Sequence, residues 1–260
     1  MLAFFTAKGG SGCSVVASAA ALLSARLGPT LLVELGGDLP AVLGLAERAD
    51  HAASHRGPSD DRSDGLGLVD WLAAESPLPD SLRRIERSVS DTLSLLPLGI
   101  GPLGMGPLGI GPPGIGPPGI GVFDPRPDQV QLLIRLLRTD GRRVVLDVGH
   151  VPSQPAGRAR GAPQSSGRVS LLEASDRTVL VTRACYLALR AAHRLTAPDQ
   201  VVLISEPGRA LSAADVAAAV GSPVAAVLRW DPAIARSVDA GVLRDHLPRS
   251  LRCLADLVAR

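Results

Sequence analysis

The sequence predicts an α/β protein with a doubly wound, mostly parallel sheet and helices on both faces. Short apolar runs alternate with segments of helical periodicity nearly from end to end, as in folds built from β-α-β units. The runs are continuously apolar, which is typical of parallel strands buried on both faces. Apolar residues make up 46% of the 260 residues. That fraction is enough for a sizeable core. The length suits one α/β domain with insertions, or at most two small ones, and we expect a single domain over residues 1–260.

The elements follow from these patterns in chain order. An apolar run predicts each strand, and helical spacing of apolar or alanine residues predicts each helix. The strands are expected at residues 2–7, 30–34, 92–96, 143–147, 177–182, 200–205 and 224–228. The helices are expected at residues 14–26, 39–47, 66–75, 80–87, 128–138, 187–195, 212–220 and 248–258.

Two segments interrupt this alternation. Residues 49–65 mix Asp, His, Ser, Gly and Pro, and we interpret them as a flexible polar loop. Residues 97–121 repeat a five-residue unit: PLGIG, PLGMG, PLGIG, PPGIG and PPGIG. A proline in each unit excludes helices and ladder strands, and a period of five is not the period of three that collagen needs. We expect a low-complexity, flexible loop, with a contact segment as the alternative because every unit carries Ile or Met.

Composition argues against several classes of function. A net charge of +2, from 27 basic and 25 acidic residues, gives no strong attraction to nucleic acid or anionic membrane. In the last part of the chain arginines alternate with aspartates, which favours a solvated face over non-specific DNA binding. The three cysteines form no CxxC pair, a pattern typical of a reducing compartment. No run of 18 apolar residues occurs, so we expect a cytoplasmic protein without a spanning helix.

Lys8 is the only lysine among the 27 basic residues. Arginine serves at every other basic position, so we infer that a compact ammonium on a flexible stem is needed here. Lys8 lies between an apolar strand and an alanine-rich helix, in a loop of glycines. A strand, a glycine loop and a helix N-terminus together are the usual site for a phosphate group. The candidate binding residues are Lys8, Gly9, Gly10, Ser11, Gly12, Cys13 and Ser14.

The loop departs from the usual phosphate-binding pattern G-x-x-x-x-G-K-[ST]. In that register Ala7 replaces the first glycine and Cys13 replaces the lysine, while Gly12 and Ser14 match. The run from Lys8 to Ser14 instead resembles the deviant Walker A box of the MinD/ParA superfamily of P-loop NTPases, from which Cys13 alone departs. The resemblance implies ATP or ADP with Mg²⁺ as ligand. It also implies a homodimer in which the early lysine contacts the partner's phosphates.

Further matches to this superfamily concern the metal and the attacking water. Residues 143–149 resemble its Walker B strand, so the resemblance implies that Ser14 and Asp147 hold Mg²⁺. The first switch of the family usually reads D-x-D, but here Glu34 and Gly36 replace the two aspartates. Asp38, two residues further on, compensates only if the loop takes another path. Without the lysine at position 13 and the water-orienting aspartate, hydrolysis is expected to be lost or strongly impaired.

The chain is most similar to the degenerate branch of the superfamily that includes TadZ and CpaE proteins. Residues 34–41 and 206–211 carry this resemblance. It implies a factor that positions and recruits pilus or secretion machinery. The resemblance also implies that partner proteins recruit this factor to the cell pole or membrane. The alternatives are an active deviant Walker A ATPase in chromosome or plasmid partition or septum-site placement, and a nucleotide-free interaction scaffold.

Overall fold

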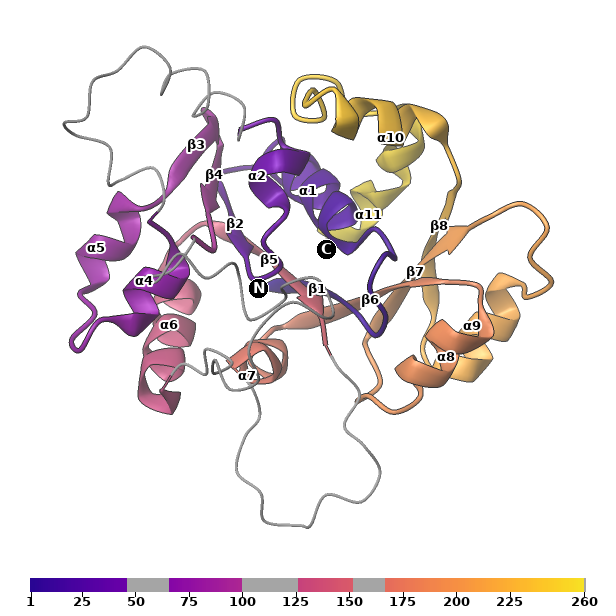
Figure 1. Cartoon of the computed structure of the whole chain (residues 1–260), viewed down its shortest axis with the longest axis horizontal. Helices are drawn as coiled ribbons and strands as arrows, with labels where there is room; N and C mark the ends of the chain where they lie inside the picture. Colours follow the sequence, from indigo (N-terminus) through magenta and orange to yellow (C-terminus); the bar gives the residue numbers. More distant parts are fainter. Residues whose placement is uncertain (46–65, 100–125, 152–166, 260) are drawn as a thin grey trace, which may run out of the picture.

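A computed structural model describes residues 1–45, 66–99, 126–151 and 167–259. Over these residues eight strands form one sheet in the order β3-β4-β2-β5-β1-β6-β7-β8 (Figure 1). All neighbouring strands are parallel except β3, which is antiparallel to β4. The predicted doubly wound, mostly parallel sheet is therefore confirmed. The strands are β1 (Leu2–Thr6), β2 (Thr30–Glu34), β3 (Arg87–Ser90), β4 (Leu93–Leu96), β5 (Arg143–His150), β6 (Arg177–Arg183), β7 (Gln200–Ser205) and β8 (Val224–Arg229).

Helices cover both faces of this sheet. The first face carries α1 (Cys13–Ser24), α2 (Leu39–Val42), α10 (Pro232–Asp239), the 3-10 helix η2 (Arg249–Leu254) and α11 (Ala255–Ala259). The second face carries α4 (Leu68–Ala73), α5 (Pro79–Arg84), α6 (Pro127–Thr139), α7 (Gly167–Glu173), α8 (Tyr186–Ala192) and α9 (Ala213–Val220). In Figure 1 the first group lies toward the top of the view and the second toward the bottom.

Successive residues of the central strands divide between two apolar cores. On β1, Phe4 belongs to the core beneath α1, whereas Ala3 and Phe5 belong to the core beneath α6. This division follows from the two-residue period of a strand, which turns successive side chains to opposite faces. It also explains why β1 and β2 are mostly apolar, since neither of their faces meets water.

The predicted elements agree with the structure most closely on the central strands, and differ elsewhere. The strands predicted at residues 30–34 and 200–205 have those bounds, while β5 continues three residues beyond the predicted end to His150. The sequence patterns missed β3, α7 and α10, and the last predicted helix begins as the 3-10 helix η2. Among the described residues, no helix is long and apolar enough to cross a membrane.

The helix predicted at residues 39–47 was too long, because α2 ends at Val42. Gly44 adopts a left-handed backbone with φ +66°, and a Cβ on it would lie 1.9 Å from the carbonyl oxygen of Gly241. No helix can continue through that conformation. The close approach to Gly241 joins the end of α2 to the turn after α10, so packing between distant segments ends this helix.

The first residues of the predicted repeat loop, 97–99, form no helix or strand but pack against the domain. Leu98 is buried, its N–H donates to Glu34 Oε2 at 2.9 Å, and its carbonyl accepts from Val69 N at 2.9 Å. Gly99 has φ +82° and packs so closely on Gly67 that a Cβ there would lie 2.6 Å from the Gly67 nitrogen. The first residues of the repeat are therefore packed against the rest of the domain. The rest of the repeat, and the loop predicted at 49–65, lie outside the described residues.

Candidate functional site

The glycine loop joins the central strand β1 to α1, and its own side chains fix its shape. Thr6 Oγ1 lies 2.9 Å from the Lys8 carbonyl oxygen and 3.0 Å from Ser11 Oγ, and Ser11 Oγ donates to the Lys8 carbonyl at 2.8 Å. Gly10 and Gly12 both have φ +77°, which side-chain-bearing residues rarely adopt. Ser11 is therefore buried and holds the loop together, while Lys8 is exposed.

The space above the loop is open. A Cβ added to Gly9, Gly10 or Gly12 would meet nothing within 4 Å. Gly12 is the N-cap of the 12-residue helix α1 and has no side chain with which to cap it. The first N–H groups of α1 thus lack intrahelical partners, and together with the helix dipole they favour an anion at this end. The loop has the room and the donors for a phosphate group.

Asp147 lies beside this loop, in the middle of β5. Its register partners are Phe4 on β1 and Glu34 on β2, and its side chain is fully buried. Oδ1 accepts from Gly149 N at 3.2 Å and lies 3.5 Å from Cys13 Sγ. Among the described residues Oδ2 has no partner with hydrogen-bond geometry, although the Ser14 side chain acts on the carboxylate. Burial raises the pKa of Asp147, although the neighbouring Ser14 and Cys13 side chains act in the opposite direction.

The carboxylate of Asp147 and the hydroxyl of Ser14 suit a magnesium ion. Both present hard oxygen atoms, and the buried, unpartnered Oδ2 is a group that a bound cation would satisfy. Asp38 is exposed at the start of α2, and its charge helps raise the pKa of Asp147. Among the described residues no three His, Cys, Asp or Glu side chains form a metal cluster. A magnesium ion here would therefore need phosphate oxygens as further ligands.

Cys13 occupies the position of the usual P-loop lysine and supplies no charge there. Its thiol is buried against Asp147 Oδ1. Burial, followed by the negative charge of Asp147, raises the pKa of Cys13 well above its ordinary value. The thiol is therefore protonated at neutral pH and inert as a nucleophile. Within the glycine loop, Lys8 is the residue whose side chain carries a positive charge.

Gly36 lies directly over the Ser14 and Asp147 side chains. A Cβ at this position would be 3.3 Å from Asp147 Oδ2 and 3.6 Å from Ser14 Oγ. The backbone of Gly36 also lies close to Gly149, whose added Cβ would be 3.2 Å from the Gly36 Cα. An aspartate at position 36 would therefore bring a second carboxylate against the buried one. The MinD/ParA pattern has an aspartate at position 36, and the close packing seen here is possible because this chain has glycine instead.

Glu34, which replaces the first aspartate of the switch, is held by backbone N–H groups of the protein itself. Its carboxylate accepts from Leu39 N at 2.6 Å through Oε1 and from Leu98 N at 2.9 Å through Oε2. The side chain is 1% exposed. Burial raises the pKa of Glu34 to about 7; the two backbone N–H groups oppose this, and the charges of Asp147 and Asp38 add to it. Glu34 thus joins the start of α2 to the chain that leaves β4.

No protein-family model matches this sequence, and neither does any curated protein sequence. Solved structures do match. A ParA family ATPase from Chlorobium tepidum TLS superposes with a TM-score of 0.63 over 99% of this chain and 98% of its own, at 18% identity. This chain has the ParA/MinD fold. MinD of Pyrococcus horikoshii OT3 with Mg-ADP gives 0.63 over 99% and 93%, at 16% identity. MinD in the Aquifex aeolicus MinC:MinD complex gives 0.62 over 100% and 94%, at 15% identity.

In this ParA/MinD fold a cavity of about 350 Å³ adjoins the glycine loop, and the sequence patterns did not predict it. Gly10 and Gly12 form one wall, and the ends of β7 and β8 with α10 form the others. Trp230, which is 54% exposed, and Arg183, which pairs with Glu206, lie at its edge. An apolar cleft with a few polar groups is typical of a small-molecule site. Aromatic residues make up only 2% of the chain, and this rarity was the one feature of the sequence that could have drawn attention to Trp230.

Arg168, at the start of α7, is a second residue that the sequence patterns missed. Its guanidinium donates to the Leu35 carbonyl at 2.5 Å and to the His150 carbonyl at 3.0 Å. These contacts join the residue after β2 to the end of β5, next to Asp147 and Gly36. Burial lowers the pKa of Arg168, while the charge of Asp147 opposes that shift. In the ParA/MinD fold of this chain, a partly buried cation thus lies beside the candidate metal site.

Proposed function

We propose that this protein is a MinD/ParA-like P-loop protein that binds adenine nucleotide with Mg²⁺ weakly and hydrolyses it slowly or not at all. Its role is the positioning and recruitment of partner proteins. The observation that carries this proposal is the buried, unpartnered Oδ2 of Asp147 beside Ser14, below an open glycine loop. A buried carboxylate oxygen without a partner is costly, and a metal–phosphate ligand would relieve that cost.

Different residues of the site contact the phosphates, the magnesium ion and the base. Backbone N–H groups from Gly9 to Ser14 contact the phosphate oxygens, and Lys8 adds a positive charge from the exposed side. Ser14 and Asp147 hold the magnesium ion, which when bound neutralises phosphate charge, with Asp38 nearby at the start of α2. The 350 Å³ cavity with Trp230 at its edge takes the base. The Mg-ADP complex of the P. horikoshii MinD structure supports this choice of ligand.

Two features of this site argue for slow hydrolysis. Cys13 supplies no positive charge at the position where P-loop enzymes place a lysine, because its raised pKa keeps the thiol neutral. Gly36 supplies no carboxylate to orient a water molecule. Removing one preorganised group at a developing charge costs about 2.7–4 kcal/mol of transition-state stabilisation, so the loss of two leaves little catalysis. Arg168 donates to two backbone carbonyls and therefore replaces neither group.

A protein that binds nucleotide without hydrolysing it fast stays in its nucleotide-bound form, and that form suits a positioning role. The exposed Lys8 is free to contact the phosphates of a second copy, so we propose a homodimer formed around bound nucleotide. The MinC:MinD complex supports protein partners for this fold. We propose that the partners belong to pilus or secretion machinery, as in TadZ and CpaE proteins, and that they bring this protein to the cell pole. The PLGIG-type repeats are candidates for a partner contact.

Calorimetric titration of the full chain with ATP and with ADP, each with Mg²⁺, tests this proposal. We expect micromolar to millimolar binding that Lys8→Ala weakens about tenfold or more, since it removes a charge-assisted phosphate contact. Arg84→Ala, which removes an exposed cation on α5, serves as the matched control and should bind as the wild type does. Turnover is then measured on the same protein. No heat of binding with either nucleotide would support a nucleotide-free scaffold, and rapid turnover would support a partition ATPase.

A further inference from the structure

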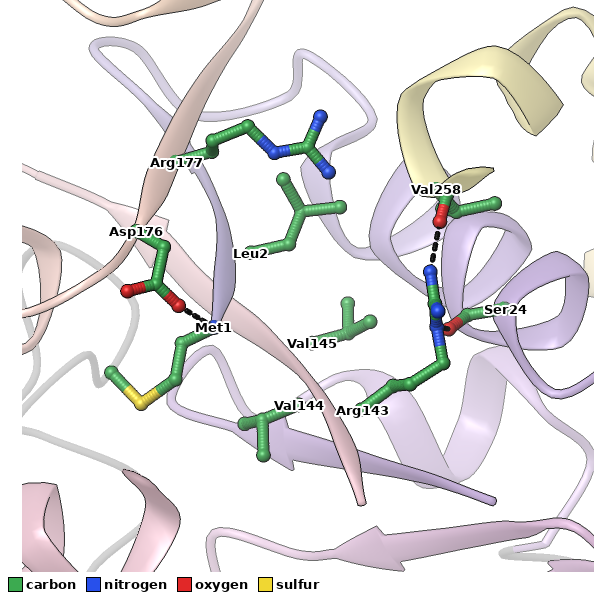
Figure 2. Close-up of a pocket in the computed structure, with 9 residues that line it drawn as sticks. All are labelled: Met1, Leu2, Ser24, Arg143, Val144, Val145, Asp176, Arg177 and Val258. Atoms are coloured by element: carbon green, nitrogen blue, oxygen red, sulfur yellow. Dashed lines mark hydrogen bonds and ion pairs between the residues drawn. The ribbon is translucent and has the colours of Figure 1, made fainter. Parts of the chain in front are cut away.

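A second cavity, of about 240 Å³, lies at the end of the sheet opposite the glycine loop. It opens where β1, β5 and β6 begin, whereas the glycine loop follows the end of β1. The end of α1 and the last helix α11 complete its wall (Figure 2). None of the residues proposed above for nucleotide lines it. Its lining residues are Met1, Leu2, Ser24, Arg143, Val144, Val145, Asp176, Arg177 and Val258.

Strand register brings two arginines of this cavity to one face of the sheet. Leu2 on β1 pairs with Val145 on β5 and with Arg177 on β6. Arg143 precedes Val145 by two residues and therefore shares its face. Leu2 and Val145 belong to the core beneath α1 and α11, so Arg143 and Arg177 lie on that side as well. In Figure 2 the Arg177 guanidinium lies above Leu2, and the Arg143 guanidinium reaches Val258 and Ser24 on the other side of the cavity.

The protein satisfies only part of the donor capacity of these two arginines. Arg143 Nε donates to Ser24 Oγ at 3.0 Å and its Nη2 donates to the Val258 carbonyl. Arg177 Nη2 donates to the Leu257 carbonyl at 2.8 Å, and Arg177 Nη1 is buried without a hydrogen-bond partner in the part of the chain that the structure describes. A buried donor without an acceptor has lost its hydrogen bonds to water without replacement, and this is most unfavourable when the group is charged. The described residues therefore offer this atom of Arg177 no acceptor.

No carboxylate of the described lining balances the two guanidinium charges. Asp176 is the only acidic residue of the lining, and it pairs with the amino group of Met1. Its side chain is 76% exposed, on the far side of Leu2 from Arg143 in Figure 2. The carbonyls of Leu257 and Val258 are neutral acceptors and accept from Nη2 atoms only. Two cations thus line a small cavity whose one described acidic residue, Asp176, pairs with the Met1 amino group and acts on Arg177 only as a neighbouring charge.

We propose that this cavity binds an oxyanion group, a carboxylate or a phosphate, through Arg177 Nη1 and the guanidinium of Arg143. The planar fork of arginine matches a pair of oxygens on either group, and ionised acceptors give stronger hydrogen bonds than water does. The volume suits a small anion, while Leu2, Val144 and Val145 provide an apolar wall. The bound anion joins the starts of β5 and β6 to α11 and so stabilises the attachment of the last helix. This site is independent of the nucleotide site.

Thermal unfolding of the full chain in increasing inorganic phosphate, and separately in acetate, tests the site. Sodium chloride of equal ionic strength corrects for screening. We expect a saturable rise in Tm with the anion that fits, and the two series distinguish a phosphate site from a carboxylate site. Arg177→Gln should weaken this response about tenfold or more, as expected for a charge-assisted contact. Arg138→Gln is the matched control, because Arg138 also donates to a backbone carbonyl, that of Ala174 at 2.8 Å, outside the cavity.

Lys8→Ala separates this site from the glycine loop, which can also bind phosphate. A response that persists in Lys8→Ala and Arg138→Gln but is lost in Arg177→Gln supports the proposal. The absence of any response beyond that of sodium chloride overturns it, and so does a response that only Lys8→Ala removes. If Arg177→Gln does not fold, Arg177→Lys keeps the charge but loses the planar fork, and an undiminished response in that variant overturns the proposal. Nucleotide binding is measured separately, so failure here leaves the proposed function untouched.

Discussion

Glu34 and Asp147 are register partners on the adjacent parallel strands β2 and β5, and both carboxyl groups are buried. Glu34 is held by the N–H groups of Leu39 and Leu98, whereas Asp147 Oδ2 has no partner. The negative charge of Asp147 adds to the effect of burial in raising the pKa of Glu34. The pair therefore connects the candidate metal site to α2 and to the chain that enters the repeat.

Glu34 should make stability depend on pH in the metal-free protein. Burial raises its pKa from 4.5 to about 7 in the folded state. Between these values the folded state binds more protons than the unfolded state, so the free energy of unfolding falls as pH rises. A shift of this size corresponds to about 3 kcal/mol, present below pH 4.5 and lost as pH rises through 7. Urea unfolding at pH 5, 6, 7 and 8 measures the slope.

Glu34→Gln should remove most of that slope, because the amide does not titrate. Its amide nitrogen must face one of the two N–H donors, so the variant is also expected to lose about 1–3 kcal/mol at the lower pH values. Glu173→Gln changes an exposed glutamate at the end of α7 and is the matched control. An unchanged slope in Glu34→Gln would assign the pH dependence to another group.

Gly36→Asp should destabilise the protein in the absence of Mg²⁺ and should recover part of that loss when Mg²⁺ and nucleotide are present. The new Cβ would lie 3.3 Å from Asp147 Oδ2, and the new carboxylate would repel the buried one. We expect a loss of about 1–3 kcal/mol, measured by urea unfolding with and without Mg-ATP. Gly36→Asn has the same volume without the charge. If both variants lose equal stability and neither responds to Mg-ATP, crowding alone accounts for the effect and no cation binds there.

Asp147→Asn should separate stability from ligand binding. Because burial raises the pKa of Asp147, removing its charge relieves a desolvation cost, so the urea midpoint at pH 8 should equal or exceed that of the wild type. Loss of the metal ligand should weaken Mg²⁺-dependent nucleotide binding about tenfold or more in calorimetry. A variant that binds Mg-ATP like the wild type would show that Asp147 is not a magnesium ligand.

The central strands and the glycine loop could be predicted because local sequence determines them. The apolar run of residues 31–33, inside the strand predicted at 30–34, favours a strand buried on both faces, and the spacing from Lys8 to Ser14 places a loop before a helix. The contact from Leu98 N to Glu34 joins residues 64 positions apart and depends on how β4 pairs with β2. The place of Arg168 depends in the same way on where α7 packs, and one arginine among many carries no local signal. Such contacts need the three-dimensional register of the sheet.

Gly44→Ala should be severely destabilising, because tertiary packing rather than local sequence ends α2. Its Cβ would lie 1.9 Å from the Gly241 carbonyl oxygen, in a residue with φ +66°. Backbone atoms cannot yield as a flexible side chain can, so we expect a loss of about 3 kcal/mol or more, at the upper end of single substitutions. Gly141→Ala is the matched control, since Gly141 has φ +83° but a Cβ there meets nothing within 4 Å. That variant should lose only about 1 kcal/mol, the cost of the left-handed backbone alone. Equal losses in urea unfolding would mean that the contact between Gly44 and Gly241 relaxes freely and does not determine where α2 ends.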